Sequence, residues 1–124
     1  MAGLRITNEM QNAFDLIEDG ENLFITGSAG SGKTTLLRLL SEKYRNNCIV
    51  CAPTGVAAIN AGGVTIHKQF SLPIGVINPN EPIERMMSNS SKAVLRKIKI
   101  LIIDEISMVR CDLMDAINRR MMSV

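Results

Sequence analysis

The feature that most constrains this chain is the glycine-rich segment 27–34, with the sequence Gly-Ser-Ala-Gly-Ser-Gly-Lys-Thr. It follows the apolar run 23–26 and precedes a helix-like pattern, which is the strand–turn–helix order of a P-loop. The glycines let backbone N–H groups turn towards a phosphate, and the next helix adds unpaired donors at its N-terminus. A dinucleotide fingerprint would need a third glycine where Thr35 stands. The segment therefore predicts a P-loop and excludes a Rossmann turn.

The side chains of this loop have separate expected roles. Lys33 can reach the β- and γ-phosphates as a positive charge, and the Thr34 hydroxyl can ligate magnesium. The expected cofactors are therefore ATP and Mg²⁺. The predicted nucleotide-contacting residues are Gly27, Ser28, Ala29, Gly30, Ser31, Gly32, Lys33, Thr34 and Thr35.

A pair of acids follows the most apolar stretch of the chain, Ile100-Leu101-Ile102-Ile103, which is typical of a parallel strand covered on both faces. Asp104 would hold the magnesium ion, and Glu105 would activate the attacking water as a general base. By themselves the two acids could simply cap a turn. Beside a P-loop they favour hydrolysis, with Lys33, Asp104 and Glu105 as catalytic residues and Thr34 and Asp104 as metal ligands.

Apolar periodicity and turn residues predict alternating helices and strands. Helices are expected at about 7–19, 32–45, 56–61 and 109–122, and strands at 23–26, 49–52 and 99–104. Segments 72–80 and 89–91 are expected to be loops. The alternation predicts an α/β fold, a parallel sheet flanked by helices. Such a domain normally has more strands, so we expect an incomplete one.

Composition narrows the class of protein further. Among 124 residues, 46% are hydrophobic and the net charge is +2, which permits nucleic-acid contact without requiring it. Three cysteines without a secretory segment indicate a reducing compartment. Cys48 and Cys51 form a CxxC pair, but the second ligand pair of a zinc site is missing, so we expect ordinary core cysteines. With no run of about 18 apolar residues, we expect a soluble intracellular protein without membrane contact, in the cytoplasm or in a nucleus or mitochondrion.

Four blocks of sequence, taken together, resemble one known family. They are 27–34, Pro-Thr-Gly-Val-Ala-Ala at 53–58, Gly-Gly-Val-Thr-Ile-His at 62–67, and Ile-Asp-Glu-Ile-Ser-Met at 103–108. This order and spacing is similar to that of the PIF-type (petite integration frequency) helicases, RecD-like members of helicase superfamily 1. The resemblance, from about Thr7 to Met122, implies that residues 1–124 are the N-terminal part of a RecA-like P-loop motor domain. It further implies a 5′-to-3′ DNA helicase with single-stranded DNA as partner, acting in DNA repair and telomere maintenance.

The resemblance also assigns nucleic-acid contacts to the middle blocks. The matching residues are Thr54, Gly55, Ala57, Thr65 and His67. A hydroxyl followed by unpaired N–H groups at a helix start is a suitable cradle for a DNA phosphate. His67 could equally be structural. Phe70 could stack on a base, although we expect it in the core, and Lys68 could contact phosphate or stay solvated.

Other positions depart from the family pattern. Val56 stands where relatives often have a basic residue, so one phosphate contact is missing. The family's adenine-reading glutamine could match position 10 or 11, and since the apolar stripe places Met10 in the core, Gln11 is the candidate.

The later helicase motifs of the family have no counterpart in this sequence. An arginine finger is not assigned either, because favourable interaction with the helix dipole suffices to explain Arg119 and Arg120 at the end of the last helix. We therefore expect these residues alone to bind nucleotide without appreciable turnover or unwinding. The alternatives left open are a small-molecule kinase and a non-catalytic nucleotide-binding module.

Overall fold

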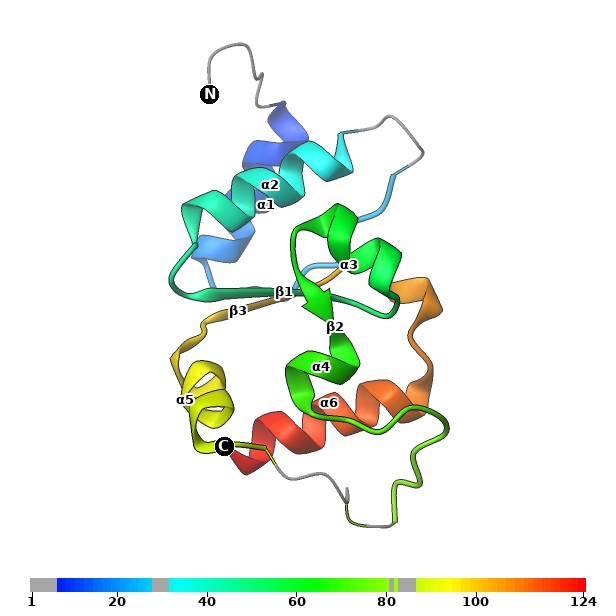
Figure 1. Cartoon of the computed structure of the whole chain (residues 1–124). Coiled ribbons are helices and arrows are strands. Elements are labelled where there is room, and N and C mark those ends of the chain that lie inside the picture. The colour runs from blue at the N-terminus through cyan, green and yellow to red at the C-terminus, as the bar shows by residue number, and fades with distance from the viewer. Residues whose placement is uncertain (1–6, 28–31, 81, 83–86) are drawn as a thin grey trace. The chain divides into compact units, whose positions relative to one another are not determined.

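The computed structural model describes residues 7–27, 32–80, 82 and 87–124 (Figure 1). The chain divides into two compact units, Met1–Lys43 and Tyr44–Val124. Each unit has its own buried apolar residues. The P-loop belongs to the first unit, and the acidic pair 104–105 belongs to the second.

The first unit is built on two helices, α1 (Asn8–Glu18) and α2 (Lys33–Lys43). Thr7 caps α1 as predicted, because its Oγ accepts a hydrogen bond from the Met10 N–H at 3.1 Å. The apolar sides of the helices are buried at Met10 and Phe14 on α1 and at Leu36 and Leu40 on α2. At the end of α2, the Lys43 ammonium lies 5.1 Å from the centre of the Phe14 ring and 3.4 Å from a Glu18 carboxylate oxygen.

The predicted strand at 23–26 is wrong for the structure described. These residues form no strand, and Phe24 and Ile25 are 76% and 42% exposed. An apolar run becomes a strand only when a neighbouring strand pairs with its backbone, and none of the strand pairings involves this segment. The apolar residues of the run predict burial, but they do not specify a strand that could pair with its backbone.

The second unit contains a parallel three-stranded sheet in the order β2-β1-β3 (Figure 1). The strands are β1 (Cys48–Ala52), β2 (Val64–Thr65) and β3 (Ile100–Ile103). In the pairing of β1 with its neighbours, Ala52 lies opposite Thr65, and Cys51 lies opposite Ile103. The predicted parallel α/β arrangement is confirmed, although β3 is half-buried along its length instead of fully covered.

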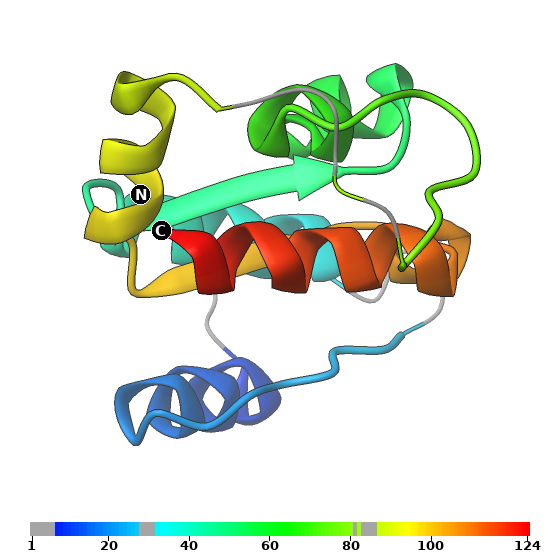
Figure 2. The same cartoon turned by 90° about the horizontal axis from the view of Figure 1, so that it is seen from below.

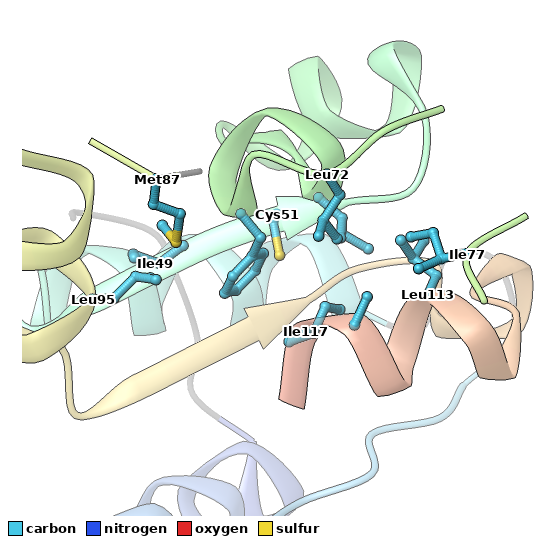
Figure 3. Close-up of a cluster of buried hydrophobic side chains, with 11 residues drawn as sticks. Ile49, Cys51, Leu72, Ile77, Met87, Leu95, Leu113 and Ile117 are labelled. Carbon is cyan, nitrogen blue, oxygen red and sulfur yellow. The ribbon is translucent and has the colours of Figure 1, made fainter. Parts of the chain in front are cut away.

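Helices connect and cover these strands. They are α3 (Gly55–Ala61), α4 (Ile66–Phe70), α5 (Asn89–Lys97), the short 3-10 helix η1 (Ile106–Met108) and α6 (Cys111–Ser123). In Figure 2, α6 runs beside the sheet, and Figure 3 shows side chains of β1 and α6 together in one apolar cluster. Phe70 is wholly buried in this cluster, which confirms its expected place in the core.

Three short segments differ from the sequence expectation. Residues 89–91 begin α5 instead of forming a loop, because the Ser88 Oγ caps the helix by accepting from the Ser91 N–H at 3.2 Å. Serine and asparagine are as common at a helix start as in a turn. The two-residue strand β2 and the five-residue helix α4 were not predicted.

The cysteine pair of β1 lies among apolar neighbours. Cys51 is completely buried and its thiol lies 3.7 Å from the Ile102 carbonyl oxygen, while Cys48 is half-buried. Burial raises the pKa of Cys51 to about 12, so this thiol stays protonated. Cys51 therefore packs as an ordinary core cysteine, as expected, whereas Cys48 is only half-buried. Among the described residues, none of the helices is both long and apolar enough to traverse a bilayer.

Candidate nucleotide and nucleic-acid site

The described part of the P-loop ends at the start of α2. Gly27 is exposed and 28–31 lie outside the described residues. Gly32 has a φ of +93°, and a Cβ there would lie 2.9 Å from the Met10 Cε. Glycine is therefore favoured here by the backbone conformation, whereas the end of the flexible Met10 side chain could move to admit a Cβ.

The next three residues occupy the first turn of α2. Lys33 and Thr34 are exposed, and Thr35 is half-buried. The Leu36 N–H donates to the Gly32 carbonyl at 2.9 Å, which closes this first turn. The N–H groups before it have no partner within the helix, as at every helix start. An exposed ammonium and an exposed hydroxyl thus stand beside backbone donors that the helix itself does not pair, which suits an anionic ligand.

The acidic pair stands where β3 ends. The Asp104 N–H donates to the Cys51 carbonyl at 2.9 Å, so the ladder continues one residue past β3. The Asp104 side chain is half-buried. Glu105 is exposed and has a φ of +55°, in the left-handed region that few non-glycine residues occupy. Such conformations concentrate at functional sites, and this one turns the chain from β3 into η1.

Two threonines, Thr54 and Thr65, follow β1 and end β2, and each caps the next helix. The Thr54 Oγ accepts from the Ala57 N–H, and the Thr65 Oγ accepts from the Lys68 N–H, both at 3.2 Å. Each hydroxyl keeps its own hydrogen for donation to a further acceptor. Gly55 is exposed at the start of α3, and Ala57 is half-buried. The two helix starts therefore offer the hydroxyl and N–H donors expected for phosphate contacts.

The strand register brings these residues to one edge of the sheet. Thr65 lies opposite Ala52, and Asp104 is level with Ala52 because Ile103 lies opposite Cys51. Adjacent strands are about 4.8 Å apart, which separates the backbones of Thr65 and Asp104 by about 10 Å. Thr54 lies two residues past Ala52 on the strand between them. The carboxyl edge thus joins three segments whose motifs are far apart in the sequence.

The positions of the remaining predicted residues do not test their expected roles in binding. His67 is half-buried on α4, and its carbonyl accepts from the Leu72 N–H at 2.9 Å. Met10 is 8% exposed, which confirms its place in the core. Gln11 is exposed, and its amide nitrogen donates to an Asp15 carboxylate oxygen at 3.0 Å. Adenine reading by Gln11 and strand contact by His67 stay predictions.

Sequence reasoning missed the structural role of Arg120. Its guanidinium donates to the Phe70 carbonyl at 3.0 Å and to the Ser71 carbonyl at 2.9 Å, which ties α6 to the end of α4. Burial lowers the pKa of this guanidinium below its ordinary value. Helix-dipole stabilisation alone is therefore an incomplete explanation of this residue. The contact joins positions 50 apart, so no local pattern could have indicated it.

A second missed arrangement lies at the start of α6. Asp112 accepts the Ile77 N–H at 2.9 Å and pairs with Arg110 at 3.0 Å, and Arg110 donates to the Gly75 carbonyl. These bonds hold the pKa of Asp112 below its ordinary value, with the Ile77 N–H as the largest cause. The two side chains thereby attach the loop 72–80 to the helix that follows the acidic pair.

Comparison with known proteins gives the same family at several levels. PIF1-like helicases match as a family over residues 5–124. Crystal structures of Bacteroides Pif1 bound to ssDNA and of Bacteroides sp. Pif1 in complex with ADP-AlF4 are 53% and 54% identical, each with a TM-score of 0.87. Both superpose on 94% of this chain and 27% of the neighbour.

Curated relatives agree with this result. ATP-dependent DNA helicase PIF1 of Candida albicans is 37% identical over 118 residues, covering 91% of this chain and 13% of the relative. ATP-dependent DNA helicase Pif1 of Bdellovibrio bacteriovorus is 39% identical over 108 residues, covering 86% and 25% respectively. The chain thus spans a quarter or less of these two relatives. Given the family match over nearly the whole sequence, the chain belongs to the PIF1-like helicase family.

Proposed function

We propose that this chain supplies the nucleotide-binding part of the first motor domain of an ATP-dependent DNA helicase that moves 5′ to 3′ on single strands. Family membership supports the proposal, as do the relatives' complexes with ADP-AlF4 and with ssDNA. The observation that carries it is the carboxyl edge of the sheet, where Thr54, Thr65 and Asp104 end or follow three parallel strands. Ligands of open parallel sheets bind at this edge.

The side chains present fit magnesium-bound ATP. Lys33 is an exposed cation at a helix start, and Thr34 beside it is an exposed hydroxyl. Asp104 adds a carboxylate, and hydroxyl and carboxylate oxygens are the hard ligands that magnesium takes. Gly32 keeps a side chain away from the loop's end, where its φ of +93° favours glycine. The predicted nucleotide residues thus have the chemistry that the proposal needs.

The proposed mechanism divides the work among these side chains. Magnesium-bound ATP supplies the phosphoanhydride bond whose hydrolysis drives movement. Lys33 binds the phosphates and offsets charge that develops on them, and Thr34 and Asp104 hold oxygen ligands ready for the metal. Glu105 accepts a proton from the attacking water at its carboxylate, a role that suits an exposed acid on a turn.

Contact with single-stranded DNA is proposed for the helix starts of the second unit. Thr54 and Thr65 can each donate a hydroxyl hydrogen to a phosphate while they continue to cap their helices. Gly55 presents an unobstructed backbone at the start of α3, since nothing lies within 4 Å of where its Cβ would be. Ala57 and His67 complete the proposed set. The cellular compartment and the roles in DNA repair and telomere maintenance stay predictions.

Steady-state ATP turnover with and without single-stranded DNA tests the proposal on a protein that contains this chain and a second motor domain. Hydrolysis stimulated by DNA supports the helicase. Phosphate transfer to a small acceptor without DNA stimulation identifies a kinase, and binding without turnover identifies a non-catalytic module.

Nucleotide binding is tested on the chain itself with Lys33→Ala. Loss of a charge-assisted hydrogen bond of about 1.5–3 kcal/mol should weaken ATP binding by about 10–100-fold. Arg38→Ala is the matched control, because Arg38 is an exposed cation on the same helix. Equal affinities of the folded Lys33→Ala and Arg38→Ala variants would contradict the P-loop assignment.

A further inference from the structure

The amino end of the sheet has a concentration of positive charge that the proposed function does not use. Residues 88–103 contain Lys92, Arg96, Lys97 and Lys99 and no Asp or Glu. Arg45 belongs to the turn that leads to this end of the sheet, since the Asn47 carbonyl, two residues after Arg45, accepts from the Lys99 N–H at 2.8 Å. We call Arg45, Lys92, Arg96, Lys97 and Lys99 the α5 basic surface.

Most of these side chains are exposed on the described part of the chain. Arg45, Arg96, Lys97 and Lys99 are exposed, and Lys92 is half-buried. Within the described ranges, none of the five takes part in an ion pair. The second unit has ten Lys and Arg against six Asp and Glu, whereas the first has four against six. The small net charge of the chain therefore conceals a strongly basic second unit.

Helix stability explains only part of this pattern. Arg96 and Lys97 lie in the last turn of α5, where cations interact favourably with the helix dipole. Lys92 lies near the opposite end, where a cation is unfavourable, and it repels Arg96 from one turn away. The first turn of α5 contains no acid that would offset this charge. An external polyanion would relieve the repulsion.

The α5 basic surface is separate from the proposed nucleotide and single-strand contacts. Figure 2 shows α5 at the end of the sheet from which β1 starts, whereas α3 lies towards the other end. Along β3, Lys99 precedes and Asp104 follows the strand, so their backbones are about 16 Å apart at about 3.3 Å per residue. One ligand phosphate cannot contact both ends of the sheet.

We propose that the α5 basic surface binds the phosphate backbone of duplex DNA, as a second nucleic-acid contact beyond the proposed single-strand site. Cations spread over a helix and an adjacent turn can follow successive phosphates without reading bases. Single-strand platforms use aromatic rings for base stacking, and residues 88–103, which supply four of the five cations, contain no aromatic residue. Duplex DNA therefore fits this surface better than a single strand does.

The test is a fluorescence-anisotropy titration of the whole 124-residue chain with a labelled 16-base-pair duplex at several salt concentrations. The triple variant Arg96→Gln, Lys97→Gln, Lys99→Gln should bind at least about tenfold more weakly at about 50 mM salt, and the logarithmic salt slope should fall by about 0.9 per charge removed. The single variant Lys99→Gln lies outside α5 and β3, so its smaller effect is measured without a change in either element.

Two controls make the result specific. The charge-preserving triple variant Arg96→Lys, Lys97→Arg, Lys99→Arg should retain duplex affinity. Arg38→Gln removes an exposed charge in the first unit and should leave the slope unchanged. An unchanged slope in the triple variant, an equal effect of Arg38→Gln, or preference for single strands or polyglutamate over duplex would overturn the proposal. ATP affinity, measured in parallel, should not change in the triple variant, so failure of the nucleotide site is distinguished from failure of this surface.

Discussion

The two ends of the three-stranded sheet differ in the kind of residue they present. At the carboxyl end, Thr54, Thr65 and Asp104 each belong to a short sequence block of defined spacing. At the amino end, Arg45 and Lys99 belong to no block, and the segments that carry them are adjacent because β1 and β3 are neighbours. The residues of the carboxyl end can be recognised in the sequence as motifs, whereas the charged surface of the amino end can be recognised only in the folded structure.

This difference has a physical basis. Directional chemistry needs a fixed backbone around each group, and a fixed backbone imposes local residue preferences, such as a capping threonine or a glycine. Binding to phosphates through diffuse charge needs only that cations lie on one face. Variants at one end of the sheet should therefore leave ligand binding at the other end unchanged.

The largest expected effect is that of Glu105→Gln on hydrolysis. In a protein with both motor domains, loss of the general base should reduce ATP turnover by about 100-fold or more with ATP affinity nearly unchanged. Phosphate release and nucleotide binding are the measurements, with Glu42→Gln on the exposed side of α2 as control. Duplex binding through the α5 basic surface should stay the same. Near-normal turnover in Glu105→Gln would mean that another group activates the water.

Gly63→Ala should destabilise the second unit itself. A Cβ at Gly63 would overlap the backbone carbonyl of Val50, so β2 and β1 would have to separate. We expect a loss of about 1–3 kcal/mol, as for other overpacked positions. Chemical denaturation measures it. Gly55→Ala is the matched control, since nothing lies within 4 Å of its Cβ position and its stability should change little. Similar losses in both variants would contradict the close approach of Gly63 to β1.

A smaller effect is expected from removing the cap of α3. Thr54→Ala should lower the free energy of unfolding by about 1 kcal/mol, because the Ala57 N–H loses its acceptor. Thr54→Ser keeps a hydroxyl and should retain most of that stability. Single-strand affinity is measured alongside the free energy of unfolding. If Thr54→Ser restores stability and DNA binding together, the hydroxyl performs both tasks. A loss of stability without any change in DNA affinity would remove Thr54 from the proposed strand contacts.

The smallest effect concerns pH and Asp112. The pKa of this carboxyl is lowered in the folded state by the Ile77 N–H and by Arg110. Its contribution to stability is therefore full above the unfolded pKa of about 3.9 and is lost as the pH falls through the lower folded value. Thermal unfolding between about pH 6 and pH 2 should show a weaker acid dependence for Asp112→Asn than for the parent chain. Asp115→Asn, on the same helix, is the control.

Much of the second unit followed from sequence patterns. The apolar run 100–103 and the pair Gly62-Gly63 predicted a parallel strand and the end of a small-residue helix, and both are confirmed. The threonines at 54 and 65 were singled out, although their capping bonds were not predicted. Helix α4 was missed because five residues show too little periodicity, and its end is completed by Arg120 from another helix.

The sequence by itself indicated a P-loop in the first unit and, in the second, an acid after an apolar strand and threonines at two strand ends, because each pattern needs particular residue types at adjacent positions. It also determined the family, since the blocks keep their order along the chain. Only the tertiary structure decided which strands pair, and therefore that Thr65 and Asp104 both lie level with Ala52 and that Lys99 lies beside Asn47, two residues after Arg45. The physical reason is that strand pairing and surface charge are formed between residues distant in sequence, where no local pattern records which partner each residue will meet.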